Sequence, residues 1–153
     1  MKIALGADHA GYDLKRSIQL HLEQKGCAVI NLGTDSSDSV DYPDYAERVA
    51  LAVANREADR GLMVCGSGVG ACVAANKVAG VRAATCHDTF SAHQGVEDDD
   101  MNVLCLGARV IGPQLAIEVI DAWLKATFSG LERHKRRLDK VVALDQKYRK
   151  MRP

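Results

Sequence analysis

The sequence lacks several features that would assign it to a membrane, secreted or metal-binding class. No run of residues approaches the roughly 18 consecutive apolar positions that a membrane-spanning helix needs. The opening MKIALGADH has none of the charged, apolar and small-residue zones of a signal peptide. The five cysteines are an odd number without a CxxC pair, which argues against a disulfide framework and a zinc site. We therefore expect a cytoplasmic protein whose thiols are mostly buried.

Aromatic residues are also scarce, at 5% of the chain, which leaves few rings on which nucleic-acid bases could stack. Basic and acidic residues balance at 20 each, but not locally. From Arg133 onward nine Lys or Arg face two Asp, a net charge of +7, so the preceding residues carry −7. This basic segment indicates an anion site or a partner. Nucleic acid is the least favoured partner, because the segment lacks aromatic interleaving and its apolar stripe suits packing.

The length of 153 residues and the apolar fraction of 47% predict one domain, residues 1–153, with a single core. Short apolar runs alternate with longer amphipathic ones. The expected strands are Lys2–Gly6, Ala28–Leu32, Arg60–Cys65, Arg82–Cys86 and Asn102–Leu106. The expected helices are Tyr12–Lys25, Ala46–Asn55, Val69–Ala79, Thr89–Gly95, a helix from Pro113 to about Thr127, and Leu131–Met151. This alternation predicts an α/β, Rossmann-like three-layer fold with a five-stranded parallel sheet and an extended C-terminal helix.

Ligands of such folds bind at the carboxyl ends of the strands. The first strand ends in GADHAG, where Asp8 can cap the next helix or contact a ligand. The third ends in CGSGVG, whose glycine N–H groups at a helix start form an anion cradle. The pattern is neither a P-loop nor a dinucleotide fingerprint. Cys65 opens this loop, where a helix N-terminus favours the thiolate.

The last helix carries an R-H-x-x-R group, Arg133, His134 and Arg137. The two arginines are four residues apart and share one helix face, a spacing that suits a phosphate. A solvated basic face explains the same residues, and the pattern alone leaves both readings open.

Together these segments resemble the ribose-5-phosphate isomerase B family, which also includes allose- and galactose-6-phosphate isomerases. The resemblance rests on GADHAGYDLK, SVDYPDYA, CGSGVGACVAANKVAGVRAA, NVLCLGARVIG and ERHKRR, in this order along the chain. It implies a metal-independent aldose–ketose isomerase with no cofactor and a phosphorylated sugar as substrate. It also implies a homodimer or tetramer with the site at the subunit interface, to which the helix 131–151 contributes.

The resemblance implies that Cys65 is the base that moves the proton, since Ala71 stands where another branch of the family has a glutamate. Ser67 and the neighbouring N–H groups would hold the enediolate oxygen, and Asp8 the sugar hydroxyls. The remaining predicted substrate and phosphate ligands are His9, Tyr42, Gly66, Gly68, Gly70, Asp99, Arg109, Arg133 and Arg137.

One segment departs from the family pattern E-H-N-x-x-N. Asp98 and Asp99 stand in place of the ring-opening histidine and the asparagine after it. Asp98 can take over as a base, or the ring can open unaided or through His87 or His93. Alternatively the substrate has no ring to open, as in a tetrose phosphate esterified at O4. The acidic run can also be only a charged helix end. Ribose 5-phosphate is the first expectation, with Asp98 as a catalytic candidate, and a tetrose 4-phosphate or a hexose 6-phosphate is the alternative substrate.

Two other classes compete with an isomerase. One is a non-catalytic phosphosugar-binding subunit of a hetero-oligomer, against which the retention of Cys65, Ser67 and Asp8 argues. The other is a flavodoxin-like nucleotide-binding module, which would have no need for a thiol.

Overall fold

Five parallel strands form one sheet in the order β2-β1-β3-β5-β4. The structure is a computed structural model and describes residues 1–149. The strands are β1 (Lys2–Ala7), β2 (Ala28–Asn31), β3 (Arg60–Cys65), β4 (Ala83–Thr85) and β5 (Val103–Gly107). The helices are α1 (Tyr12–Gln24), α2 (Tyr42–Ala54), α3 (Val69–Ala75), α4 (Thr89–Asp99), α5 (Pro113–Lys125) and α6 (Glu132–Arg149), and a 3-10 turn, η1, covers His9–Gly11. The predicted fold class is confirmed.

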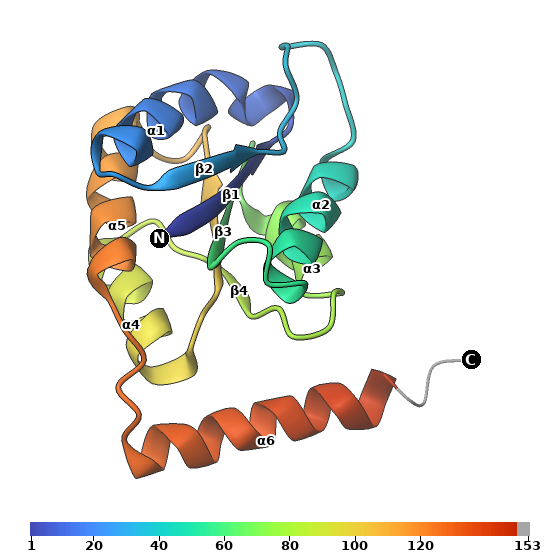
Figure 1. Ribbon diagram of the computed structural model, residues 1–153. Coiled ribbons are helices and arrows are strands. Elements are labelled where there is room, and N and C mark those ends of the chain that lie inside the picture. Colours follow the sequence, from blue (N-terminus) through green and yellow to red (C-terminus); the bar gives the residue numbers. More distant parts are fainter. Residues whose placement is uncertain (150–153) are drawn as a thin grey trace.

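Helices cover both faces of the sheet (Figure 1). α1, α4 and α5 pack on one face, and α2 and α3 pack on the other. The pleat divides each strand between the two faces. In β1, Ile3 and Leu5 join the core under α1 and α5, whereas Ala4 joins the core under α2. The strands are therefore packed on both faces, and this packing fixes the loops that follow their carboxyl ends.

The start of α2 and the end of α3 differ from the sequence prediction for identifiable reasons. α2 begins at Tyr42 and not at Ala46, because Pro43 lies in its first turn, where a missing N–H costs nothing. α3 ends at Ala75 and not at Ala79. There the side chain of Asn76 pairs with the backbone of Ala83, at 2.9 Å in both directions, and turns the chain into β4.

α4 continues past Gly95 to Asp99, four residues beyond the prediction. Asp100 ends it in the left-handed conformation, with φ at 52°. The carboxylate of Asp100 accepts a hydrogen bond from Arg82 at 2.6 Å. Asp98 and Asp99 consequently lie in the last turn of a helix, so that their side chains have fixed directions.

α6 runs apart from the layered body, at the bottom of Figure 1, while the long loop 32–41 lies at the top. It leaves several large apolar side chains exposed: Val141, Val142, Leu144 and Tyr148. The expected helix 131–151 is confirmed up to Arg149, and its last two residues lie outside the described part. Within residues 1–149, no helix has the length and apolar character needed to cross a bilayer.

Candidate active site

The carboxyl ends of β1 and β3 bring Asp8 and Cys65 together. Ala7 pairs with Val64 in the parallel register, so the next residue of each strand lies at the same level. The N–H of Asp8 donates to the Val64 carbonyl at 3.2 Å, which holds the two strand ends against each other. Both side chains are buried, at 5% exposed for Asp8 and 4% for Cys65.

The loop after β3 wraps around the Cys65 sulfur. The N–H of Gly68 donates to Sγ at 3.1 Å. Gly68 has φ at 82°, and a Cβ there would lie 2.9 Å from Cγ2 of Thr85, so this turn requires glycine. Ser67 is exposed at the tip, and its Oγ accepts from the N–H of Val69 at 3.2 Å. A thiol and a set of N–H donors at a helix start therefore share one small space.

Asp8 both caps the following turn and keeps a free oxygen. Its Oδ1 accepts from the N–H groups of Ala10 at 3.0 Å and Gly11 at 3.1 Å. Its Oδ2 forms no hydrogen bond within residues 1–149. The capping role considered from the sequence is thus present, and it leaves one carboxylate oxygen able to accept from a ligand hydroxyl.

His9 and Tyr42 line the same edge from two directions. Nδ1 of His9 lies 3.1 Å from the N–H of Val40 and 3.2 Å from the Val40 carbonyl oxygen, so the loop holds this side of the ring and leaves Nε2 without a partner in the described residues. The Tyr42 ring lies against Gly70 in the first turn of α3. A Cβ at Gly70 would come within 2.7 Å of Cζ of Tyr42, so the close approach requires glycine.

Arg109 reaches the loop from the end of β5. Its N–H donates to the Gly66 carbonyl at 3.0 Å, and the N–H of Ala108 donates to the Cys65 carbonyl at 2.8 Å. A Cβ on Gly66 would lie 3.6 Å from Nη1 of Arg109. The guanidinium therefore lies beside the glycine loop, where it supplies a positive charge next to Gly66.

The other predicted site residues lie elsewhere. Asp98 and Asp99 are at the C-terminal end of α4, and Arg133 and Arg137 are in α6. α4 begins after the carboxyl end of β4 and ends before the amino end of β5. Its last turn therefore lies about 15 Å from its first turn, near the amino edge of the sheet. One chain therefore carries two groups of predicted site residues, at opposite edges.

The His134 ring lies between two members of this second group, Arg133 and Asp98. Nε of Arg133 donates to Nε2 of His134 at 3.0 Å, which places the ring proton on Nδ1. That nitrogen lies 2.6 Å from Oγ of Ser129 and 3.4 Å from Oδ1 of Asp98. Asp98 also accepts from Gln94 at 2.7 Å. The carboxylate of Asp98 is thus already engaged in holding α6 to α4.

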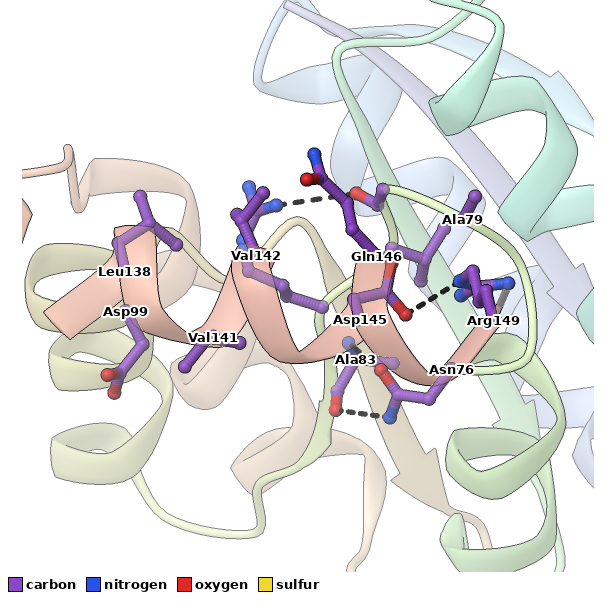
Figure 2. Close-up of a pocket in the computed structure, with 13 residues that line it drawn as sticks. Asn76, Ala79, Ala83, Asp99, Leu138, Val141, Val142, Asp145, Gln146 and Arg149 are labelled. Carbon is purple, nitrogen blue, oxygen red and sulfur yellow. Dashed lines mark hydrogen bonds and ion pairs between the residues drawn. The ribbon is translucent and has the colours of Figure 1, made fainter. Parts of the chain in front are cut away.

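A separate cleft lies under α6, and Cys65 does not line it. It has a volume of about 560 Å³ between α6 and residues 76–83. Figure 2 shows Leu138, Val141 and Val142 of α6 along one wall, with Asp99 at one end. Arg149 closes the other end through a hydrogen bond from Nη1 to the Lys77 carbonyl at 2.6 Å.

The two histidines considered for ring opening are placed differently. Nε2 of His87 accepts from the N–H of Gly107 at 2.9 Å, beside the loop of Cys65. His93 is exposed on α4 and lies 3.3 Å from Glu97. Among residues 1–149, no three His, Cys, Asp or Glu side chains converge as metal ligands would.

A second thiol has distinct chemistry. The hydrogen bond from the Cys105 thiol, with others from Thr85 and Asn76, outweighs burial and lowers the pKa of Cys72 to about 6. Burial, with the nearby charge of Asp88, raises the pKa of Cys86 to about 11. Cys72 is half-buried, so it combines thiolate character with access from solvent.

Comparison with known proteins identifies the family. A sequence model of the Ribose/Galactose Isomerase family matches residues 3–141. The chain belongs to this family. It is 48% identical over 146 residues to "Ribose-5-phosphate isomerase B" of Escherichia coli K12, covering 95% of this chain and 97% of that one. The resemblance inferred from the sequence is confirmed.

Two further similarities bear on the site. The solved structure of Clostridium thermocellum ribose-5-phosphate isomerase B superposes with a TM-score of 0.94 at 48% identity, covering 97% of this chain and 99% of the other. A "D-erythrulose-4-phosphate isomerase" of Pectobacterium atrosepticum is 47% identical over 131 residues, 85% of this chain and 86% of that one. Members with different named substrates are therefore similarly related to this chain.

Sequence reasoning missed two residues that bond to segments carrying candidate site residues, Lys15 and Gln94. Lys15 is 2% exposed on the face of α1 that also carries Leu14 and Ile18. A lysine on an apolar helix face is a readable signal of a buried cation. Gln94 gives no such signal, because its partner Asp98 is recognisable only once α4 is known to extend past Gly95.

Proposed function

We propose that the chain interconverts ribose 5-phosphate and ribulose 5-phosphate through an enediolate, with Cys65 as the base. This conversion belongs to the pentose phosphate pathway. The observation that carries the proposal is the thiol of Cys65, held at the start of α3 by the Gly68 N–H at 3.1 Å, with Asp8 beside it.

The reaction moves one proton between neighbouring carbons. The Cys65 thiolate removes the proton from C2 of the open-chain aldose, and the electron pair forms the C1–C2 double bond of the enediolate. The N–H groups of the loop 66–70, with Ser67, stabilise the developing oxyanion. The thiol then returns the proton to C1, while the hydroxyl proton passes from O2 to O1. Asp8 Oδ2 would orient the sugar hydroxyls, and Tyr42 would line the sugar.

The phosphate would lie at the other end of the sugar, bound by His9 and Arg109 of one chain and by Arg133 and Arg137 of a second copy. Support comes from the split of these residues between opposite edges of the sheet. A two-fold symmetric dimer brings the α6 group of each chain to the Cys65 group of its partner. It would also cover the apolar face of α6. Phosphate binding far from the reacting carbons supplies energy for positioning them.

The proposed compartment is the cytoplasm. All five cysteines are free thiols, and free thiols persist in a reducing environment. The proton transfer itself needs a base and oxyanion donors, which the side chains and loop supply without a cofactor.

The test is isomerase activity of the purified chain and of Cys65→Ala. The variant should bind ribose 5-phosphate in calorimetry but lose turnover about 10³-fold, the scale expected for removal of an acid–base group. Cys27→Ala, at the opposite edge of the sheet, is the matched control and should keep full activity. Normal turnover by Cys65→Ala would overturn the assignment of the base.

A tetrose 4-phosphate is the second candidate substrate. The carboxylate of Asp98 is bound to Gln94 at 2.7 Å and lies 3.4 Å from His134, which leaves it poorly suited to open a sugar ring. A tetrose esterified at O4 cannot close a furanose and needs no such group. The relative named D-erythrulose-4-phosphate isomerase, at 47% identity, is consistent with this reading.

Asp98→His separates the two substrates. Rates with ribose 5-phosphate and erythrose 4-phosphate are measured for both forms of the chain. If ring opening limits the pentose reaction, Asp98→His raises the ribose rate and leaves the tetrose rate unchanged. A wild-type rate that is higher for ribose 5-phosphate and falls in Asp98→His would instead assign the ring-opening role to Asp98.

A further inference from the structure

Lys15 is the one lysine of the described chain that is buried: it is 2% exposed, on the inner face of α1. Its ammonium lies at the carboxyl end of β2, where the loop 32–41 begins. Nζ donates to the Thr34 carbonyl at 2.7 Å and to Oδ1 of Asn31 at 3.1 Å. Burying a cation is costly unless its donors are used, so these bonds are strong constraints on the loop.

The surrounding packing leaves the Lys15 side chain little choice of position. A Cβ at Gly33 would lie 2.7 Å from Cδ of Lys15 and 2.7 Å from the Ala7 nitrogen, so the loop presses directly on the lysine stem. The Tyr12 ring lies 5.5 Å from the ammonium on another side. Burial lowers the pKa of Lys15, an effect that the charge of Asp35 partly opposes.

The loop that Lys15 holds by these hydrogen bonds, here called the clamp, contacts two predicted ligands, His9 and Tyr42. The N–H of Thr34 donates to the Ala7 carbonyl at 2.9 Å, so the clamp adjoins Asp8. At the other end of the loop, the N–H of Val40 donates to Nδ1 of His9 at 3.1 Å, and α2 begins with Tyr42. The seven residues 34–40 have no helix or strand of their own, so their conformation depends on such anchors.

We propose that Lys15 is a positioning residue of the active site, whose ammonium fixes the Thr34 carbonyl and thereby holds the loop that presents His9 and Tyr42 to the phosphosugar. The proposal rests on the proposed function for the identity of the ligand. Lys15 contacts no reacting atom in this scheme. It acts on binding, through the placement of the His9 ring and of Tyr42.

The experiment compares Lys15→Met, which keeps the apolar stem, with Arg16→Met, its exposed neighbour on α1. Steady-state kinetics should show the KM for ribose 5-phosphate raised about tenfold in Lys15→Met, the loss expected for one charge-assisted hydrogen bond, with kcat changed less than about threefold. Arg16→Met should match the wild type. Lys15→Arg, which keeps a buried donor, should recover part of the KM.

Hydrogen exchange of residues 34–40 supplies a readout that needs no catalysis. Lys15→Met should accelerate exchange there about tenfold or more, because the loop opens locally, while the strands keep their protection. Asn31→Ala, at an exposed position, removes the oxygen that accepts from Nζ of Lys15 at 3.1 Å and from the N–H of Gly33 at 3.2 Å, and should give a smaller change in the same direction. It therefore tests the clamp even if Lys15→Met does not fold.

Unchanged exchange and unchanged KM in folded Lys15→Met would overturn the proposal, and so would a fall in kcat alone. If the wild type has no activity on any sugar phosphate, the proposed function fails. Exchange of residues 34–40 would still decide whether Lys15 holds the loop.

Discussion

Arg133 is the residue whose substitution should most clearly change substrate binding without changing the catalytic step. It projects from α6 and is fixed through Nε by His134 at 3.0 Å. A guanidinium that binds the phosphate equally in the ground state and the transition state affects KM and not kcat. In Arg133→Ala we expect the KM for the sugar phosphate to rise about 10- to 100-fold, the loss of one charge-assisted contact, with kcat within about threefold.

Arg136 provides the control for this measurement. It is exposed on the same helix and carries the same charge, so Arg136→Ala reports the effect of net charge alone. An equal rise of KM in both variants would show that α6 attracts the substrate through its general charge and that Arg133 has no specific contact.

Cys72 gives a pH-dependent prediction. Because hydrogen bonds lower its pKa to about 6, the thiolate fraction rises with pH through that value. Alkylation by iodoacetamide, followed by mass spectrometry of the peptide, should reach half its maximal rate near pH 6. Cys86, whose pKa is raised to about 11, should stay unmodified at neutral pH.

The donor responsible for the low pKa of Cys72 can be removed. Cys105→Ala deletes the thiol that donates to Cys72, and the midpoint of its alkylation profile should move to higher pH. A profile that stays in place would contradict this cause. Tests of Cys65 by alkylation consequently need a Cys72→Ser background, since both thiols are candidates for modification.

At the scale of elements, α4 and α6 are joined by His134. Its ring is 3% exposed and lies between Ser129, Asp98 and Arg133. In His134→Ala the start of α6 loses these links, and Arg133 loses its support. We expect faster hydrogen exchange in residues 132–138 and a rise in KM comparable to that of Arg133→Ala. The double variant should then cost little more than either single one, whereas additive losses would mean that His134 acts independently of Arg133.

The sequence predicts the strands and their order along the chain well, because each is a short apolar run whose carboxyl end meets a turn. It locates helix ends less well, since these depend on tertiary contacts. Asn76 ends α3 by bonding to Ala83, and Asp100 ends α4 while bonded to Arg82. The same reasoning finds most candidate site residues by motif, but not that they form two groups at opposite edges.

For the whole molecule, this division has a direct consequence for assembly. A site that needs Cys65 of one edge and Arg133 of the other requires two chains. The mass in solution should then be at least twice the chain mass of 16.5 kDa. Since α6 carries both the arginines and an exposed apolar face, the surface that would assemble the proposed dimer would also complete the site.

Mixing two variants that are each defective at low substrate concentration tests whether the site is shared between chains. Cys65→Ala lacks the base, and Arg133→Ala/Arg137→Ala lacks the α6 cations, so each homodimer has two defective sites. After subunit exchange in an equal mixture, half of the dimers are mixed, and each mixed dimer holds one intact and one doubly defective site. We expect recovery of about one quarter of the wild-type activity at low substrate concentration. If each site is built within one chain, mixing restores nothing, because no chain then carries both groups intact.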